Sequence, residues 1–332
     1  MHTLVLSHTD VVRLLPMASC IDLMAETLAA TSRGEALLPL RQVIRLPDSP
    51  NAFALMPALL GDALGAKIIT VFPGNDATPY ESHIGVVLYF ETSNGQLRAI
   101  IDASSITAIR TAAVSGLATQ LLARRDAGDL ALLGGGVQAL THLEAMACAR
   151  PLRRVRIWSR SELRRNDFVR LAKARLGIDV VPSLTPRDAV RGADIICTVT
   201  SSREPVLHGD WIADGAHINA VGASLKAARE LDTAAVVKSK LFVDRRESTL
   251  NEAGDFLIPR SEGAITDAHI RGEIGELVAG RVDGRGSGSD VTLFKSLGLA
   301  VEDIACAAYL YKRALTEGAG TRLAIGGLRD AH

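Results

Sequence analysis

Hydrophobic positions in the middle of the chain follow two alternating spacings. Short apolar runs, of which Asp129–Leu133 is the first, precede segments such as Val137–Ala149 in which apolar side chains recur every three or four residues. The first spacing is typical of buried strands and the second of helices that cover them. Strands that recur about every 25 residues with helices between them predict a parallel, doubly wound sheet. Further strands are predicted at 154–158, 178–182, 194–200, 216–221 and 241–244, and further helices at 161–176 and 186–190.

Residues 1–125 have a different pattern. A mostly helical start up to Arg33 is followed by short apolar runs that are separated by Pro, Gly and Asn-Gly, which are residues that favour turns. The tripeptide Ser93-Asn94-Gly95 predicts a hairpin, because Asn and Gly both accept positive φ. The pattern therefore predicts an antiparallel sheet with strands at 42–46, 52–57, 66–72, 85–91 and 97–102.

Two long helical patterns complete the chain. An Ala-rich helix is predicted over 104–124, where it leads into the parallel sheet, and a second helix over 299–315. The second helix has no strand partner, so we expect it to fold back onto the first region. The sequence thus predicts an α/β protein of two domains. An α+β domain with the antiparallel sheet would comprise 1–122 plus 304–332, and a Rossmann-type domain with the doubly wound sheet would comprise 123–303.

Composition narrows the choice of partners. The 332 residues include 37 Lys plus Arg and 37 Asp plus Glu, so no whole-molecule field attracts nucleic acid or an anionic membrane. The four cysteines are far apart and lack the spacing of a zinc site. We therefore expect no nucleic acid, no membrane and no metal as partners. The chain does not start with a basic segment before an apolar one, and no window approaches ~18 apolar residues, which predicts a cytoplasmic location.

A glycine-rich turn joins the first parallel strand to its helix. The sequence Gly134-Gly135-Gly136-Val137-Gln138-Ala139 fits the pattern G-x-G-x-x-A. In this motif the first glycine makes a tight turn, the second lets a pyrophosphate approach the backbone, and the small third residue lets the helix pack on the strand. The helix N-terminus adds N–H donors and a partial positive charge. The position of the motif between a strand and a helix predicts a nicotinamide dinucleotide site.

The end of the second parallel strand indicates which dinucleotide is bound. An NAD site places Asp or Glu there to accept a hydrogen bond from the ribose 2′-hydroxyl. This chain has Ser159-Arg160-Ser161 instead, with Arg164 and Arg165 one turn later. Donors without an acid suit a 2′-phosphate, so NADP(H) is the preferred cofactor and NAD(H) is possible. A solvated basic start of a helix would show the same residues.

Three cations in the first domain are candidates for holding an anionic substrate. Arg41 follows Leu38-Pro39-Leu40, Lys67 lies within an apolar strand pattern, and Arg110 lies within the Ala-rich helix. A guanidinium buried in such a helix needs an anionic partner. Each of the three would also suit a surface or structural ion pair, and spacing alone does not show that they converge.

Nine short segments between residues 39 and 303 recur in a fixed order in one known family. They are PLR at 39–41, Lys67 before TVF at 70–72, SH at 82–83, IRTAA at 109–113, GGGVQA at 134–139, WSR at 158–160, HINAVGAS at 217–224, NEAGD at 251–255 and FKSLGLAVED at 294–303. By these segments the chain resembles the ornithine cyclodeaminase/μ-crystallin family. The resemblance implies a homodimer that acts on C–N bonds with a nicotinamide cofactor, in which the antiparallel domain carries the substrate and dimer contacts.

The resemblance also implies roles for individual residues. The carboxylate of a small imino or amino acid would lie on Arg41, Lys67 and Arg110, with Glu252 near the substrate. Lys67, Arg110 and Ser224 would serve the reaction itself. The residues that would contact the cofactor are Ser82, His83, Thr111, Gly134, Gly136, Val137, Gln138, Ser159, Arg160, Ser161, Thr200, Val221 and Ser296.

Position 224 separates the branches of the family. In the cyclodeaminase branch the corresponding segment resembles VGGD, whereas this chain has Val221-Gly222-Ala223-Ser224. The aspartate of that segment is the expected acid and base for the loss of ammonia in those enzymes. The serine version resembles the μ-crystallin branch, whose activity is ketimine reduction. We therefore expect an NADP(H)-dependent reductase of cyclic pyrroline- or piperideine-2-carboxylates. The alternatives are an ornithine cyclodeaminase-type lyase, an alanine, arginine or opine dehydrogenase, and a non-catalytic protein that binds NADPH or a small acid.

Overall fold

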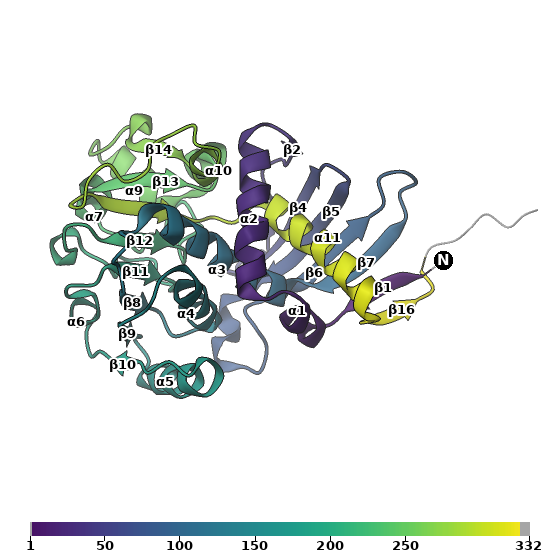
Figure 1. The fold of residues 1–332 in the computed structure, drawn as a ribbon, viewed down its shortest axis with the longest axis horizontal. Helices are drawn as coiled ribbons and strands as arrows, with labels where there is room; N and C mark the ends of the chain where they lie inside the picture. The colour runs from purple at the N-terminus through teal and green to yellow at the C-terminus, as the bar shows by residue number, and fades with distance from the viewer. Residues whose placement is uncertain (1, 326–332) are drawn as a thin grey trace, which may run out of the picture. The chain divides into compact units, whose positions relative to one another are not determined.

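The computed structural model describes residues 2–325, and the chain divides into two compact units. The first unit comprises the chain up to Arg110 together with the segment from Leu299 onward, and the second runs from Thr111 to Gly298 (Figure 1). The predicted α/β class is confirmed, with one mainly antiparallel and one parallel sheet. The domain boundaries expected at 122–123 and 303–304 differ from these limits and stay a prediction.

The first unit is built on a mixed sheet, eight-stranded within residues 2–325, in the order β16-β1-β7-β6-β5-β4-β2, with β3 paired to β4. The predicted strands, β3 to β7, pair antiparallel as expected. Strands β1, β2 and β16 were not predicted; β2 and β16 also pair antiparallel, whereas β1 and β7 are parallel. No hairpin joins these two, and only a hairpin obliges neighbours to run antiparallel. The strands are β1 (Thr3–Leu6), β2 (Ala36–Leu37), β3 (Gln42–Arg45), β4 (Ala52–Leu60), β5 (Ala63–Val71), β6 (His83–Phe90), β7 (Leu97–Asp102) and β16 (Thr321–Leu323).

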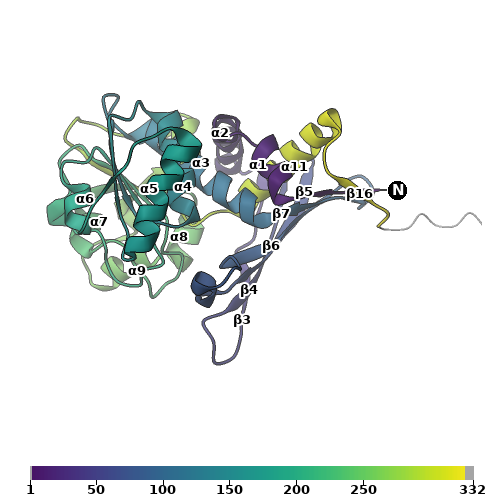
Figure 2. The same ribbon diagram turned by 90° about the horizontal axis from the view of Figure 1, so that it is seen from below.

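Helices cover one face of this sheet. Burial alternates along the first part of β5, where Lys67 is among the buried residues. Helix α11 (Ala300–Glu317) packs on β4 to β7, and α2 (Met17–Ser32) packs against α11. Figure 2 shows α1 (His8–Leu14), α2 and α11 on the same side of the sheet. The prediction that the last long helix folds back onto the first region is therefore confirmed.

The second unit is a doubly wound sheet in the order β10-β9-β8-β11-β12-β15-β13-β14. Its neighbouring strands are parallel, as predicted, although β14 and β15 themselves were not predicted from the sequence. The order reverses between β8 and β11, and ligands of such sheets bind at the carboxyl ends of the strands at that point. The strands are β8 (Asp129–Leu133), β9 (Arg154–Trp158), β10 (Val181–Pro182), β11 (Ile195–Thr198), β12 (His217–Ala220), β13 (Ser239–Val243), β14 (Ile270–Glu273) and β15 (Val291–Lys295).

The predicted helices lie close to their predicted ranges, but the short helices between residues 233 and 278 were not predicted from the sequence. Helix α5 begins after Ser161, whose hydroxyl oxygen accepts the N–H of Arg164 as an N-cap. The strand expected at 178–182 is reduced to β10, in which Val181 and Pro182 pair with Arg156 and Ile157 of β9. The remaining helices are α3 (Ala103–Leu122), α4 (Val137–Ala149), α5 (Glu162–Leu176), α6 (Pro186–Val190), α7 (Thr233–Lys238), α8 (Arg246–Glu252), α9 (Gly254–Ser261) and α10 (Ile274–Val278), with the short 3₁₀ helices η1 (Pro73–Ala77), η2 (Gly209–Trp211) and η3 (Asp267–His269).

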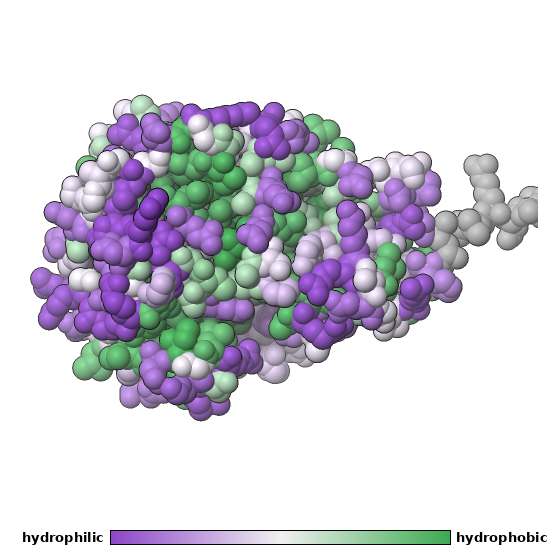
Figure 3. All heavy atoms as spheres, viewed as in Figure 1, coloured by the Kyte–Doolittle hydropathy of each residue, from purple (hydrophilic) through white to green (hydrophobic). Residues whose placement is uncertain are grey.

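Two searches of the described residues bear on partners. None of their helices is long and apolar enough to cross a membrane. Within the same residues, no group of three or more His, Cys, Asp or Glu side chains is arranged to hold a metal ion. On the face seen in Figure 3, hydrophilic and hydrophobic residues are interspersed. The cytoplasmic location stays a prediction.

Candidate active site

Lys67 lies in the middle of β5, on the face of the first sheet that α11 covers. Only 2% of the surface of Lys67 is exposed to solvent. The Nζ atom lies 3.2 Å from Oδ1 and 3.4 Å from Oδ2 of Asp303, which is on α11. A buried ammonium is thus paired with a buried carboxylate, an arrangement in which loss of either partner is strongly destabilising.

Arg110, on α3, binds the same carboxylate. Its Nε donates to Oδ1 of Asp303 over 3.0 Å, and its Nη1 donates to Oε2 of Glu302 over 2.8 Å. All three residues are buried. Asp303 therefore joins Lys67 to Arg110, and the structure brings together two of the three predicted substrate-binding cations. Thr111, a predicted cofactor contact, is the next residue on α3.

Arg41 belongs to the same charged neighbourhood. Burial lowers the pKa of Lys67 to about 8; the carboxylate of Asp303 opposes this shift, and the positive charges of Arg110 and Arg41 add to it. An interaction of this kind requires Arg41 to lie near Lys67. The three predicted cations therefore do converge within the first unit.

His83 and Ser82 lie beside this cluster at the start of β6. Loss of hydration lowers the pKa of the His83 imidazole, and the charges of Lys67 and Arg110 lower it further, although part of the residue remains exposed. The Oγ of Ser82 lies 3.0 Å from Nδ1 of His83. His83 is therefore kept neutral near pH 7, as a group that can accept or donate a hydrogen bond.

Glu302 and Asp303 were not among the site residues predicted from the sequence. They occupy the first turn of α11 and are 1% and 0% exposed. The sequence does contain a signal for them, namely two adjacent acids within an otherwise apolar helical pattern. Carboxylates that are buried in such a helix are rare unless they are paired, so this pattern indicates a buried ion pair with a cation elsewhere in the chain. Within the described residues, Asp303 binds both Lys67 and Arg110, and Glu302 binds Arg110. Lysine and arginine carry more N–H donors than these bonds use, so the two cations can offer further donors to an anionic group.

The glycine-rich turn after β8 has the conformation that its motif requires. Gly134 has a φ of 123°, and a Cβ there would lie 2.7 Å from the carbonyl oxygen of Val199, so no larger residue fits. Gly136 is the N-cap of α4, and a Cβ added to it would meet nothing within 4 Å. No side chain caps this helix end. Open space therefore adjoins uncapped backbone N–H groups at Gly136.

These features fit the pyrophosphate of a nicotinamide dinucleotide. The N-terminus of α4 offers donors and a partial positive charge to an anion. The Oε1 atom of Gln138 is buried without a hydrogen-bond partner within the described residues, and Val137 next to it is 60% exposed. Gly134, Gly136, Val137 and Gln138 would thus hold the cofactor at the point where the strand order reverses.

The residues after β9 offer donors beside this turn. Ser159 lies against the turn, since its Oγ would be 3.3 Å from a Cβ on Gly135. Within residues 2–325 the side chains of Ser159 and Arg160 form no hydrogen bond or ion pair, and the O–H of Ser161 remains a donor because only its oxygen serves the N-cap. Arg165 was expected as a further donor, but it is buried and donates to the carbonyl of Ser159 over 3.0 Å.

Five further predicted site residues lie in the second unit. Thr200, Val221 and Ser296 follow the carboxyl ends of β11, β12 and β15, the edge that also carries the glycine-rich turn. Ser224 is exposed, and Glu252 ends α8. The contacts of Ser224 and Glu252 with a substrate stay predictions.

The similarity of this chain to known proteins extends over both units. The model of the ornithine cyclodeaminase/mu-crystallin family matches residues 1–318. Ketimine reductase mu-crystallin of Mus musculus is 39% identical over 280 residues, which is 84% of this chain and 85% of that protein.

Two solved structures show the same fold. Delta(1)-pyrroline-2-carboxylate reductase of Thermococcus litoralis, in complex with NADH and L-proline, is 37% identical with a TM-score of 0.94, over 97% of this chain and 100% of that one. An archaeal alanine dehydrogenase dimer with bound NAD is 30% identical with a TM-score of 0.91, over 97% of this chain and 99% of that one.

Proposed function

The chain belongs to the ornithine cyclodeaminase/mu-crystallin family, and from this we propose that it is an NADP(H)-dependent reductase of small cyclic α-imino acids. Its relatives are named reductases and dehydrogenases, two of them with a bound nicotinamide cofactor, so the chain is an NAD(P)H-dependent oxidoreductase. The proposal adds the substrate class, pyrroline- or piperideine-2-carboxylates, and the preference for NADP(H). The observation that carries it is the convergence of Arg41, Lys67 and Arg110 within the first unit.

The proposed substrate carboxylate lies on Arg41, Lys67 and Arg110. A carboxylate is attracted by these three cations, and beside the buried Lys67 and Arg110 that attraction is much stronger than in water. Glu302 and Asp303 hold the cations in place before the substrate arrives, so little reorganisation is needed. Fixing the carboxylate also fixes the neighbouring C=N bond, which removes translational freedom from the reaction.

Lys67 is the proposed proton donor. With a pKa of about 8, it carries its proton near pH 7 and can release it to a neutral imine nitrogen. A substrate that arrives as an iminium ion needs no proton from the protein. When bound, the nicotinamide cofactor supplies the hydride that the carbon accepts. A carboxylate beside Lys67 raises the pKa of its ammonium and keeps it charged while the substrate is bound.

Ser224 argues against the cyclodeaminase alternative. Cyclodeamination needs a base for the attacking amine and an acid for the departing ammonia, and a hydroxyl cannot ionise near pH 7 to serve as either. General acid–base help is typically worth ~10²–10⁴-fold. Reduction lacks this requirement, because its substrate arrives with the C=N bond already made. In our proposal Ser224 holds a water near the substrate nitrogen.

The preference for NADP(H) rests on Ser159, Arg160 and Ser161. These side chains offer donors where a 2′-phosphate would lie, and no acid is present to repel it. Hydrogen bonds to a charged group contribute ~1.5–3 kcal/mol each, so we expect NADPH to bind at least ~tenfold more tightly than NADH. Comparable dissociation constants for the two cofactors would overturn this part of the proposal.

The proposed assembly is a homodimer formed through the open face of the first sheet. Opposite the face that α11 covers, a row of apolar side chains runs across three strands, with Leu55 paired to Ile68 and Ile68 to Val86. All three are partly exposed, and the neighbouring Phe53 and Ile84 are 36% and 44% exposed. Contiguous exposed apolar surface of this kind marks an association site. Light scattering should give twice the chain mass, and Ile84→Lys should lower it.

Cofactor consumption distinguishes the reductase from its alternatives. The substrates are preformed five- and six-membered cyclic imino acids, pyruvate with ammonia, and ornithine with ammonia release as the readout. We expect rapid NADPH consumption with the cyclic imines and little ammonia from ornithine. Vigorous ammonia release would establish the lyase, pyruvate as the best substrate would establish the alanine dehydrogenase, and cofactor binding without any turnover would establish the binding protein.

A further inference from the structure

Glu230 is buried at the carboxyl edge of the parallel sheet and binds two strand ends at once. It is 0% exposed. Its Oε1 accepts the N–H of Thr200 over 2.6 Å and the hydroxyl of the same residue over 2.7 Å. Its Oε2 accepts the hydroxyl of Thr198 over 2.8 Å and the N–H of Gly222 over 2.7 Å. One carboxylate therefore ties the loop after β11 to the loop after β12.

Asp255 and Lys295 hold Glu230 in turn. Oδ1 of Asp255 accepts the N–H of Glu230 over 2.8 Å and that of Leu231 over 3.0 Å. Its Oδ2 lies 3.0 Å from Nζ of Lys295, which ends β15 and also lies 3.2 Å from the carbonyl oxygen of Ala220. Each oxygen of Glu230 faces a backbone N–H donor, so both must accept a hydrogen bond. Burial and the charge of Asp255 raise the pKa of Glu230, whereas the charge of Lys295 and the hydrogen bonds from Thr200 lower it.

Gly222 shows how closely the two loops approach each other. A Cβ on this residue would lie 2.0 Å from the carbonyl oxygen of Thr200 and 2.6 Å from Oε1 of Glu230. There is no room for a side chain, so the backbone of the two loops meets around the Glu230 carboxylate. Thr200 and Val221, which flank this contact, are two of the proposed cofactor residues.

We infer that Glu230 is a positioning residue for the nicotinamide cofactor, acting through Thr200 and Val221 without touching the cofactor itself. This inference rests on the proposed function, because it takes the carboxyl edge of this sheet as the cofactor site. It assigns to a buried acid outside the glycine-rich motif the task of fixing the strand-end loops before the cofactor binds. Such preorganisation reduces the cost of ordering loops on binding.

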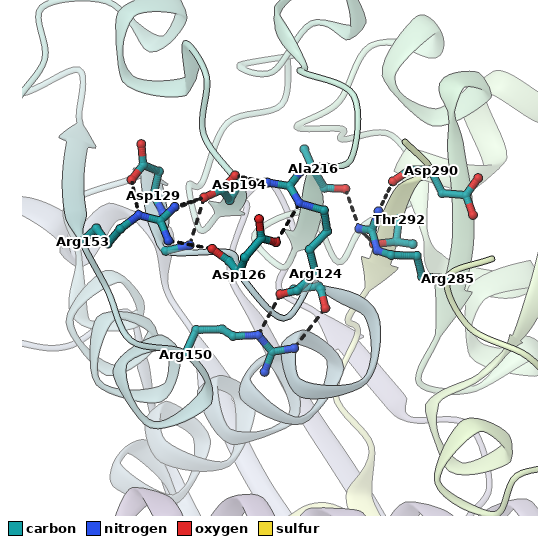
Figure 4. A network of polar contacts seen from close by, with 12 residues as sticks. Arg124, Asp126, Asp129, Arg150, Arg153, Asp194, Ala216, Arg285, Asp290 and Thr292 are labelled. Atoms are coloured by element: carbon teal, nitrogen blue, oxygen red, sulfur yellow. Dashed lines mark hydrogen bonds and ion pairs between the residues drawn. The ribbon is translucent and has the colours of Figure 1, made fainter. Parts of the chain in front are cut away.

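Asp194 provides a matched control at the opposite edge of the same sheet. It precedes β11, accepts the backbone N–H groups of Gly128 over 2.9 Å and Asp129 over 3.0 Å, and pairs with Arg124 and Arg153. Figure 4 shows Asp194 between these two arginines. Like Glu230 it joins neighbouring strands, but at their amino ends. Loss of Asp194 should therefore lower stability without affecting cofactor binding.

The test compares Glu230→Gln with Asp194→Asn. Glutamine keeps the size of Glu230, but its amide group must face one of the two fixed N–H donors, those of Thr200 and Gly222. NADPH titration gives the dissociation constant, and thermal unfolding without cofactor gives the stability of each variant. We expect Glu230→Gln to raise the dissociation constant for NADPH at least ~tenfold and Asp194→Asn to raise it less than ~threefold, although both lower the melting temperature.

Two results would overturn the inference: unchanged NADPH affinity in folded Glu230→Gln, or equal weakening in both variants. If Glu230→Gln shows no cooperative unfolding transition, Glu230→Asp replaces it as the test variant. Aspartate keeps the carboxylate, but its side chain is one methylene shorter, so the carboxylate lies farther from the donors of Thr200 and Gly222. That variant should weaken NADPH binding by at least ~threefold, and wild-type affinity in it would equally overturn the inference. A wild-type protein that binds neither NADPH nor NADH would instead overturn the proposed function, whatever the variants do.

Discussion

Asp303→Asn is the sharpest test of the charged cluster, because this one carboxylate touches both Lys67 and Arg110. Asparagine has the same shape but no charge. Its side-chain oxygen can still accept the Nε–H of Arg110, which now lies 3.0 Å from Oδ1. What the variant removes is the negative charge that opposes the lowering of the Lys67 pKa. The pKa of Lys67 should therefore fall below about 8, and the cluster should become less stable.

The size of the stability loss follows from which cation can give up its proton. Lys67 has a pKa of about 8, so at pH 7 it can become neutral at a cost of about 1.4 kcal/mol, which limits its share. Arg110 cannot deprotonate, but it exchanges a charged acceptor for a neutral one, a difference of about 1 kcal/mol. The sum, about 2–3 kcal/mol, is below the ~3–5 kcal/mol of a buried pair broken without relief.

The assay is kcat/KM against pH for the wild type, Asp303→Asn and the matched control Glu302→Gln. Protonated Lys67 is the active form, so kcat/KM of the wild type should fall as pH rises through about 8, since this ratio reports groups of the free enzyme. In Asp303→Asn the fall should begin at lower pH. Glu302 accepts from Arg110, whereas Asp303 also contacts Lys67 directly, so the Glu302 variant should move the fall much less than Asp303→Asn does. An unmoved profile in Asp303→Asn, or an equal shift in Glu302→Gln, would refute the reasoning.

Three other outcomes are expected. Lys67→Ala and Arg110→Ala should each lower turnover ~30- to several thousandfold, because a buried partner of the substrate carboxylate is worth roughly 2–5 kcal/mol. The affinity of each variant for NADPH should stay within a few-fold of the wild type. Wild-type turnover in either variant would show that the replaced residue does not belong to the substrate site. Arg160→Ala should narrow the preference for NADPH over NADH by at least ~tenfold in cofactor titrations. The ring nitrogens of His142 face the Gln138 carbonyl and the Ser115 hydroxyl, and burial lowers the pKa of this histidine to about 4. The stability that depends on its neutral state is therefore complete above pH 6.5 and is lost as pH falls toward 4. Urea unfolding should show a loss of up to about 3 kcal/mol in the free energy of unfolding over that range, and His142→Gln should lack this loss.

Features coded by neighbouring residues could be predicted from the sequence. The glycine-rich turn is one, because Gly134, Gly136 and Ala139 lie within six consecutive residues and each has its own steric task. The N-cap Ser161 is another, since its partner is only three residues away. The hairpin at 93–95 was predicted in place but not in detail: Gly95 has a φ of 74°, whereas Asn94 is not among the residues of positive φ.

Features that depend on distant contacts could not be predicted. Lys67 and Asp303 are 236 residues apart, and no local pattern reveals that a strand and the last long helix will bring them together. The parallel pairing of β1 with β7 has the same origin, because the two strands meet only after the intervening chain has folded. Arg165 looked like a cofactor donor by its position, yet a buried guanidinium takes the nearest carbonyl oxygen. In each case tertiary packing, which the sequence analysis does not contain, decides the outcome.

The buried acids of the two units differ in what they bind, and this difference separates structure from function. In the second unit, backbone N–H groups and hydroxyls donate to Glu230, and Asp255 accepts two backbone N–H groups beside Lys295. In the first unit, Asp303 and Glu302 hold the side chains of Lys67 and Arg110. A backbone N–H is used up by the one acceptor that it faces, whereas Lys and Arg carry further N–H donors that a second carboxylate can use. We therefore expect the first unit to bind one small carboxylate, even though the 37 positive and 37 negative residues of the chain balance.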